Sequence, residues 1–263
     1  MTFLQRARIL LCLSAPAVFG ACALPEPPNP ETTPPEILYN RALDLLIKNK
    51  EYTKAGNEFD AIERYYPYSR WAPRAQIMLA FTYYVKKEYD DAIVVLDRFI
   101  QLYPGNTYAA YAYYLKALCY YDQISDVRRD QKMTVAALEA LQQVVTRFPL
   151  TDYAKDAAVK IELANDHLAG KEMSVGRFYL RQGMHLAAMN RFIRVVKEYQ
   201  TTDHVQEALY RLTETYLILG LTEEAQKSAA VLGYNYPSGK WYRKAYNLMK
   251  KKTNLALNET KKE

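Results

Sequence analysis

The sequence predicts an all-α protein built as a solenoid of about five irregular helical hairpins. Its 263 residues include only 9 Gly but 24 Tyr, so the turns that sandwiches and barrels need are scarce. Five aromatic residues are each followed by a residue that marks the end of a helical segment. These pairs are Tyr66-Pro67, Tyr103-Pro104, Phe148-Pro149, Tyr199-Gln200 and Tyr236-Pro237. We expect one repeat domain over residues 36–250, followed by a charged tail over 251–263 without clear periodicity.

The first helix has a marked start. Thr33, Pro34, Pro35 and Glu36 form the pattern of a capping box with proline in the first turn, so we expect Thr33 to cap this helix. The second helix of every hairpin carries an alanine twelve positions before its stop. These alanines are Ala55, Ala92, Ala137, Ala188 and Ala225. A small residue at this position allows two helices of a hairpin to approach closely.

The first helix of each hairpin shows a matching pair of residues, such as Gly176 and Tyr179 in the fourth. Together these positions resemble the tetratricopeptide repeat, with irregular spacing between the stops. Two insertions explain the irregularity. Residues 122–131 are polar and are expected to form a solvated loop, or else a contact with a partner protein. Residues 151–170 are expected to add helical sequence.

The first residues have the pattern of a secretory signal. Arg6 and Arg8 precede an apolar run that ends in small residues and Cys22. This ending resembles a lipobox, which implies a signal peptide over 1–21 and a lipid on Cys22; a plain signal peptide with an incidental cysteine is the alternative. Residues 22–35 contain many prolines and are expected to form an extended linker. In lipoproteins of this type, Asp directly after the lipidated cysteine often signals retention in the inner membrane. This sequence has Ala23 there, so the resemblance implies a protein that is lipid-anchored in the outer membrane and faces the periplasm.

The residue inventory disfavours several classes of function. The net charge is +6, but basic and acidic residues alternate along the helical segments, so nucleic-acid binding is not expected. The three cysteines and three histidines lack the spacing of metal sites, and neither a metal nor a cofactor is expected. Cys119 lies in an apolar stretch and is expected in the core. Carboxylates on polar helix faces, without a nucleophile, argue against an enzyme.

Four strings of sequence, in order, resemble the BamD (ComL) family of outer-membrane assembly lipoproteins. They are ERYYPYSRWAPRAQ at 63–76, YDDAIVVLDRFIQLYPGN at 89–106, YYDQISDVRRDQ at 120–131 and SVGRFYLRQGMHLAAMNRF at 174–192. The resemblance implies a non-enzymatic scaffold that helps to insert barrel proteins into the outer membrane. It also implies three partners: a POTRA domain of BamA, other Bam lipoproteins, and the carboxy-terminal signal of unfolded barrel precursors. Asn190 and Arg191 match the family position that contacts BamA.

The residues themselves suggest where a precursor binds. An extended aromatic segment with a free carboxylate needs flat rings and a cation. The candidates are Tyr66, Tyr68, Arg70, Trp71 and Arg74, with Tyr108 and Tyr111 from a later tyrosine cluster. Packing between hairpins is the alternative role, above all for Tyr66, because an aromatic recurs there in every repeat. A different tetratricopeptide lipoprotein, serving as an adaptor for proteases or peptidoglycan enzymes, is the alternative function.

Overall fold

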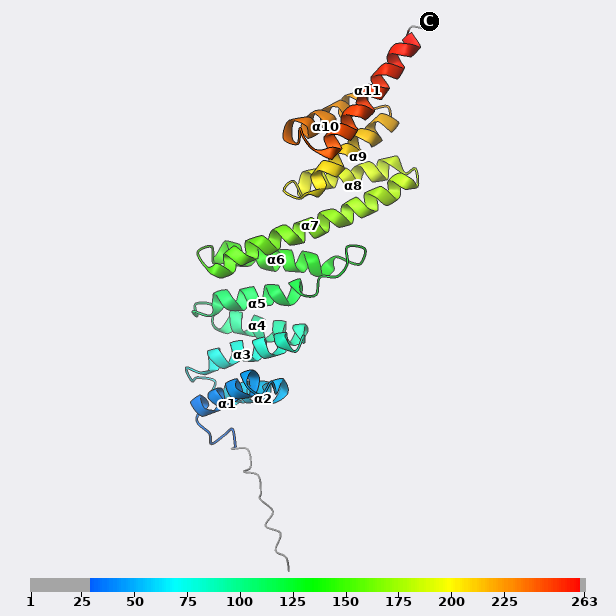
Figure 1. The fold of residues 1–263 in the computed structure, drawn as a ribbon. Helices are drawn as coiled ribbons and strands as arrows, with labels where there is room; N and C mark the ends of the chain where they lie inside the picture. The colour runs from blue at the N-terminus through cyan, green and yellow to red at the C-terminus, as the bar shows by residue number, and fades with distance from the viewer. Residues whose placement is uncertain (1–28, 261–263) are drawn as a thin grey trace, which may run out of the picture.

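The protein was analysed as a computed structural model that describes the backbone of residues 29–260 and the side chains of residues 29–252. The described residues form eleven helices in an elongated stack (Figure 1). The helices are α1 Pro35–Ile47, α2 Tyr52–Tyr65, α3 Ala72–Val85, α4 Tyr89–Leu102, α5 Ala109–Tyr121, α6 Lys132–Arg147, α7 Asp152–Arg181, α8 His185–Glu198, α9 His204–Ile218, α10 Thr222–Asn235 and α11 Lys240–Thr260. The prediction of an all-α, tetratricopeptide-like solenoid is confirmed.

The helices pair in sequence order into five hairpins. The first helices α1, α3, α5, α7 and α9 pack against the second helices α2, α4, α6, α8 and α10 respectively. Each second helix except the last also packs against the first helix that follows it, while α3 contacts α5, α5 contacts α7 and α7 contacts α9. Helix α11 packs against both α9 and α10, as the first helix of a further hairpin does. From α3 onward, the first helices therefore share one continuous face of the stack.

Each second helix ends in the same backbone conformation. The capping residues Tyr66, Tyr103, Phe148, Tyr199 and Tyr236 have φ between −136° and −127° and ψ between 45° and 55°. In each, the backbone N–H donates to a carbonyl four residues earlier. This recurrence includes Tyr199, which Gln200 follows in place of proline. The aromatic residue, and not proline alone, therefore marks the end of the helix.

The five alanines that mark the second helices are completely buried. The exposed fraction is 0% for Ala55, Ala92, Ala137, Ala188 and Ala225. Large side chains pack beside four of them, where Phe59, Leu96, Leu141 and Phe192 are also fully buried. In the fifth hairpin this second position is Ala229, which is only half-buried. The close approach of helices within each hairpin thus follows from the small residue predicted there.

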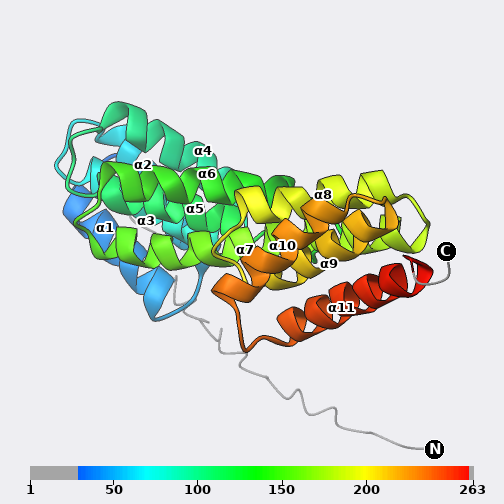
Figure 2. The same ribbon diagram turned by 90° about the horizontal axis from the view of Figure 1, so that it is seen from above.

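The long helix α7 joins two hydrophobic cores. Ala157, in its amino-terminal half, packs with α5 and α6, whereas Ala169 and Met173, in its carboxy-terminal half, pack with α8 and α9. Figure 2 shows α7 passing from the group of α1–α6 to the group of α8–α11. At 30 residues it spans about 45 Å. The insertion expected over 151–170 is therefore the helical bridge between the two halves of the stack.

The expected capping box at the start of α1 is wrong. Pro34 occupies the N-cap position, and no side chain accepts a hydrogen bond from the first turn. The Thr33 hydroxyl instead donates to the carbonyl of Asn29 at 2.8 Å, as part of a turn over residues 29–33. Thr33 is buried there, so the fixed backbone of the prolines sets the start of the helix without a side-chain cap.

The two ends of the chain bear on the expected domain limits. Helix α11 continues to Thr260, so residues 251–260 of the expected tail are helical. The expected signal peptide over 1–21, Cys22 and the linker up to residue 28 lie outside the described residues. The last linker residues contact the repeats, because the Tyr66 hydroxyl donates to the carbonyl of Glu31 at 2.8 Å. Within the described part of the chain, no helix combines the length and apolarity of a membrane span.

Candidate partner-binding sites

Trp71 lies at the centre of an aromatic and cationic cluster at the amino-terminal end of the stack. It occupies the N-cap position of α3, in the connection that follows the first hairpin. The guanidinium carbons of Arg70 and Arg74 each lie 5.4 Å from the centre of its ring. On the other side, the ring of Tyr39 from α1 lies 5.0 Å away, centre to centre. Both arginines are exposed, so their charge remains accessible to a ligand.

Tyr39 and Tyr108 complete this cluster. Burial raises the pKa of Tyr39 above its usual value, the nearby phenol of Tyr108 raises it further, and the cation of Arg74 opposes both effects. Tyr108, at the N-cap of α5, and Arg74 therefore lie within electrostatic range of Tyr39. We name the set Tyr39, Arg70, Trp71, Arg74 and Tyr108 the amino-terminal aromatic surface. Sequence reasoning missed Tyr39, because on α1 it is one apolar residue among several.

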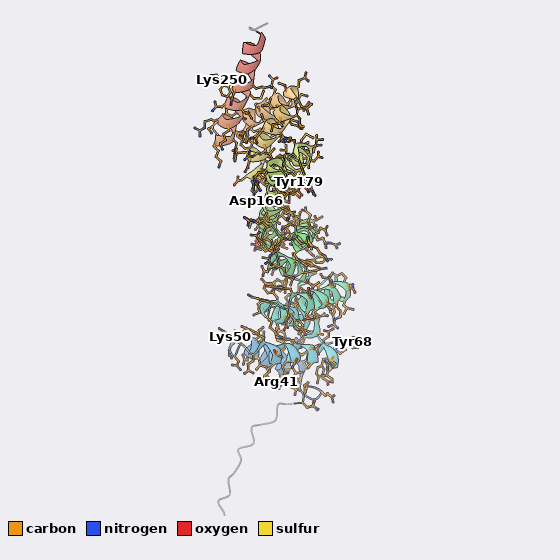
Figure 3. The ribbon with its side chains drawn as sticks, turned by 90° about the vertical axis from the view of Figure 1, so that its right-hand side faces the viewer. Arg41, Lys50, Tyr68, Asp166, Tyr179 and Lys250 are labelled. Carbon is orange, nitrogen blue, oxygen red and sulfur yellow. The ribbon has the colours of Figure 1, made fainter. Side chains whose placement is uncertain are left out.

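Three of the expected groove residues lie apart from this surface. The Tyr66 ring packs against the core of the first hairpins and its hydroxyl holds Glu31. Tyr68 is fully exposed, and Figure 3 shows it at the opposite end of the first hairpin from Lys50. Tyr111 stacks on Tyr153 of α7 at 5.6 Å, and burial raises its pKa to about 12. Tyr66 and Tyr111 therefore have packing roles in the structure.

The amino-terminal aromatic surface is suited to binding a ligand that carries both an aromatic group and a carboxylate. Flat ring faces take up apolar or aromatic side chains, and guanidinium groups bind carboxylates through charge-assisted hydrogen bonds. Among the described side chains, the one carboxylate that Arg70 approaches is that of Glu36, at 4.0 Å, and both side chains of this pair are largely exposed. Such an exposed pair is weak and exchanges readily with a ligand carboxylate.

A second arrangement of charges lies at the fourth hairpin. Glu172 on α7 is only 8% exposed, and its two carboxylate oxygens accept hydrogen bonds from Arg191 at 3.0 Å and Arg194 at 2.9 Å, both on α8. The Arg191 side chain remains about two-fifths exposed, and Asn190 beside it is exposed. Arg191 thus pairs inside its own chain and still presents part of its guanidinium to a partner.

The insertion over 122–131 is attached to α7 by its backbone. The Lys171 ammonium on α7 donates to the carbonyls of Arg128 and Arg129 at 3.0 and 3.2 Å. Val127 packs close to Gly170 of the same helix. The charged residues of this loop, Asp126, Arg128, Arg129 and Asp130, are exposed, so the loop is solvated on its outer side and is anchored to α7 through its backbone.

Residues suited to covalent or metal chemistry are not gathered at these surfaces. Cys119 is fully buried, and burial raises the pKa of its thiol to about 12, so it packs as a core residue. Within residues 29–252, no group of three or more His, Cys, Asp or Glu side chains is placed to hold a metal ion. The two surfaces described above are suited to binding the side chains and charged groups of a partner.

A stack of helical hairpins with aromatic and charged contact surfaces defines a repeat-type binding scaffold. The sequence profile of the family described as YfiO, outer membrane lipoprotein, matches residues 31–232. The chain is 50% identical to "Outer membrane protein assembly factor BamD" of Caulobacter vibrioides, over 83% of this chain and 72% of that protein. It is 48% identical to the BamD of Rickettsia prowazekii, over 89% and 92% of the two chains. The chain belongs to this outer-membrane lipoprotein family.

Two solved repeat proteins show a distant likeness. The TPR domain of P58(IPK) matches with a TM-score of 0.42 at 15% identity, over 87% of this chain and 67% of that one. The TPR protein TTC0263 of Thermus thermophilus matches with a TM-score of 0.38 at 18% identity, over 82% and 98%. The assignment of the fold rests on the repeated hairpins of this chain.

Proposed function

We propose that this protein is a non-enzymatic scaffold lipoprotein for the assembly of β-barrel proteins in the outer membrane. The observation that carries the proposal is its identity of 50% and 48% to two assembly factors over most of its length. The family description, outer membrane lipoprotein, agrees with a location at that membrane. The stacked hairpins suit a scaffold, because each repeat adds surface on which a partner can bind.

We assign the binding of unfolded barrel precursors to the amino-terminal aromatic surface. A precursor that ends in an aromatic residue with a free carboxylate matches a ring flanked by two guanidinium groups. Trp71 and Tyr39 provide the ring faces, and Arg70 and Arg74 provide the charge. Tyr108 extends this surface onto α5. Tyr68, exposed at the neighbouring turn, is available to a longer segment of the precursor.

We assign docking of a BamA POTRA domain to the fourth hairpin around Asn190 and Arg191. The exposed part of Arg191 lies beside the exposed Asn190 amide, so the two can bind a partner carboxylate and its neighbouring backbone. Glu172 holds the arginine in place before the partner arrives, which reduces the entropy lost on binding. Other Bam lipoproteins have room along the remaining repeats.

The membrane anchor in this proposal is a lipid on Cys22, followed by a linker over residues 22–35 and the repeat domain. A protein with two or more acyl chains stays on a bilayer, whereas a single chain dissociates readily. Cys22→Ser should therefore release the protein from membranes of cells in which its complex partners are depleted. Retention of the variant in the outer-membrane fraction under those conditions would contradict the anchor.

The proposed function is tested by purifying the native complex from membranes and identifying its members. We expect BamA among them, in an amount comparable to this protein. Recovery of proteases or peptidoglycan synthases without BamA would instead support the adaptor function. A matched preparation from cells that lack this protein identifies components that bind the resin alone.

A further inference from the structure

Helix α11 carries positive charge that its own sequence does not balance. The chain has no Asp or Glu between Glu224 and Glu259. In the part of α11 whose side chains are described there are six cations: Lys240, Arg243, Lys244, Lys250, Lys251 and Lys252. All of them are exposed, and none forms an ion pair within residues 29–252. The last described helix is therefore a basic element.

Most of these cations lie on the side of α11 that faces away from the stack. On the opposite side, Trp241, Tyr242 and Ala245 pack with the core of the last hairpins. Five of the cations follow at intervals of three, four or seven residues, and residues at these intervals share one face of a helix. We name these five the basic face of α11: Lys240, Arg243, Lys244, Lys250 and Lys251.

The basic face is accessible. Helix α11 packs against α9 and α10. Figure 1 shows it at the end of the stack opposite α1, where its carboxy-terminal part extends beyond the other helices. A large partner can therefore approach this face without displacing another helix of the described chain.

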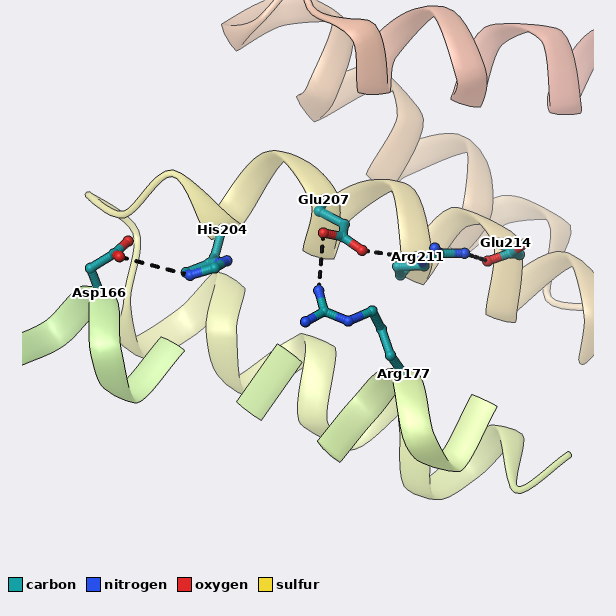
Figure 4. A network of polar contacts seen from close by, with 6 residues as sticks. All are labelled: Asp166, Arg177, His204, Glu207, Arg211 and Glu214. Atoms are coloured by element: carbon teal, nitrogen blue, oxygen red, sulfur yellow. Dashed lines mark hydrogen bonds and ion pairs between the residues drawn. The ribbon is translucent and has the colours of Figure 1, made fainter. Parts of the chain in front are cut away.

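Carboxylates on the two helices beneath α11 are bound to other cations. Glu214 of α9 borders the same shallow hollow as Lys251, but it accepts a hydrogen bond from Arg211 at 2.8 Å (Figure 4). Glu224 of α10 accepts one from Lys227 at 2.7 Å. Because these carboxylates are paired elsewhere, the charge of the basic face remains available to an anionic partner.

The composition of the basic face favours a membrane surface over a protein as this partner. Protein interfaces have an apolar core, and lysine is depleted in them. Here lysine predominates, and Tyr246 is the one large apolar side chain exposed on residues 240–252. A row of lysines along a helix attracts anionic head groups without needing a complementary shape. Tyrosine is also common at the boundary between lipid and water.

We propose that the basic face of α11 binds the anionic phospholipid surface of the outer membrane. The lysine and arginine side chains pair with phosphate groups, and Tyr246 lies at the level of the head groups. Because α1 and α11 lie at opposite ends of the stack, this contact holds the stack along the membrane. It rests on the location at the outer membrane and not on the recognition of a precursor.

The test measures binding of the protein to vesicles by sedimentation. The full mature chain carries Cys22→Ser, so that no lipid on this residue contributes. Vesicles of phosphatidylcholine with phosphatidylglycerol are compared with vesicles of phosphatidylcholine alone. We expect binding to the anionic vesicles only, and its loss at high salt, because salt screens the attraction between charges. The vesicles contain neither BamA nor a precursor, so the result does not depend on those interactions.

Exposed lysines elsewhere in the stack provide the matched control. Lys250→Gln with Lys251→Gln should weaken binding to the anionic vesicles by about tenfold or more, because two cations near the surface are lost. Lys250→Arg with Lys251→Arg keeps the charge and should bind as the parent chain does. Lys132→Gln with Lys197→Gln removes the same charge from α6 and α8, and should change binding by less than about twofold.

Circular dichroism checks that each variant is folded. No binding to the anionic vesicles at low salt, equal binding to the neutral vesicles, or equal losses in the two glutamine variants would each overturn the proposal. Binding of polyglutamate by a chain that does not bind the anionic vesicles would overturn it in favour of an acidic protein partner.

Discussion

Arg191 and Glu172 join α8 to α7 through a hydrogen bond of 3.0 Å to a carboxylate that is almost completely buried. The same carboxylate accepts a second hydrogen bond, from Arg194 at 2.9 Å. Removal of either arginine leaves the buried charge paired with the other one. The two positions are therefore comparable in their bond to Glu172, although Arg194 also donates to the exposed Glu198 at 2.8 Å.

Arg191→Ala and Arg194→Ala separate docking from stability. We expect each variant to lower the free energy of unfolding by about 1 kcal/mol, because the hydrogen bond to Glu172 is lost. Arg194→Ala also removes the exposed pair with Glu198, which adds little to stability. Only Arg191→Ala should reduce co-purification with BamA, measured as the ratio of the two proteins. Equal loss of BamA in both variants would show that the hairpin is merely destabilised and that Arg191 makes no contact.

Gly176 allows close packing of α7 on α8. A Cβ atom added to Gly176 would lie 2.5 Å from Cε1 of Phe192, which is fully buried. Gly176→Ala should therefore lower the free energy of unfolding by about 1–3 kcal/mol, measured by urea denaturation. Alanine in place of glycine inside a helix normally raises stability by about 1 kcal/mol, so a loss of stability here would show that the clash with Phe192 dominates.

Gly105→Ala is the matched control, because no atom lies within 4 Å of a Cβ added there and its φ angle is not positive. Its stability should change by less than about 0.5 kcal/mol. A stabilised Gly176→Ala variant would show that Phe192 moves away easily and that the packing of α7 on α8 is loose.

The hydrogen bond between Tyr114 and Asp156 predicts a pH dependence. The Tyr114 hydroxyl donates to the Asp156 carboxylate at 2.5 Å, and this bond, together with that from Lys160, lowers the pKa of Asp156 below its usual value. A lowered pKa in the folded state adds stability above the unfolded value of about 3.9, and this stability is lost as the pH falls through the folded pKa. Tyr114→Phe should therefore cost more stability at pH 6 than at pH 3.

The measurement is urea denaturation at the two pH values. Tyr111→Phe is the control, because Tyr111 stacks on the same Tyr153 ring and burial, not a carboxylate, dominates its environment. A penalty for Tyr114→Phe that is equal at both pH values would show that the ring packing of Tyr114, and not its hydroxyl, stabilises this junction.

The repeats were predictable from sequence because each depends on a local signal. A small residue such as Ala55 and a stop such as Tyr66 recur at fixed spacing, and a hairpin needs little beyond them. Thr33 failed as a predictor because the same string permits two hydrogen-bond partners, and the turn at Asn29 took the hydroxyl. The continuation of α11 to Thr260 was missed because the sequence there lacks apolar periodicity.

The candidate sites were only partly predictable, since they combine residues from different hairpins. Trp71 and its two arginines are neighbours in sequence, and their cluster was expected. Tyr39 and Glu172 were not expected, because their roles appear only when α1 meets α3 and α7 meets α8. Tyr111 was expected in a groove, but its partner Tyr153 lies beyond an insertion whose path the sequence does not specify.

Recognition of a precursor at the amino-terminal aromatic surface is the central claim, and tryptophan fluorescence tests it most directly. The chain has two tryptophans, Trp71 and Trp241, and both have cations over their rings. In Trp241→Phe, emission therefore reports Trp71 alone, and in Trp71→Phe it reports Trp241 alone. The ligand is a peptide of an outer-membrane barrel's carboxy-terminal signal, ending in phenylalanine, prepared with a free carboxylate or as the amide.

In Trp241→Phe, we predict a saturable change in emission with the free acid. The amide should bind about tenfold more weakly, a loss of about 1.4 kcal/mol, because the arginines lose their anionic partner. Trp71→Phe should show no change in the emission of Trp241. Equal responses from the two tryptophans, or equal binding of acid and amide, would contradict recognition of the precursor at Trp71.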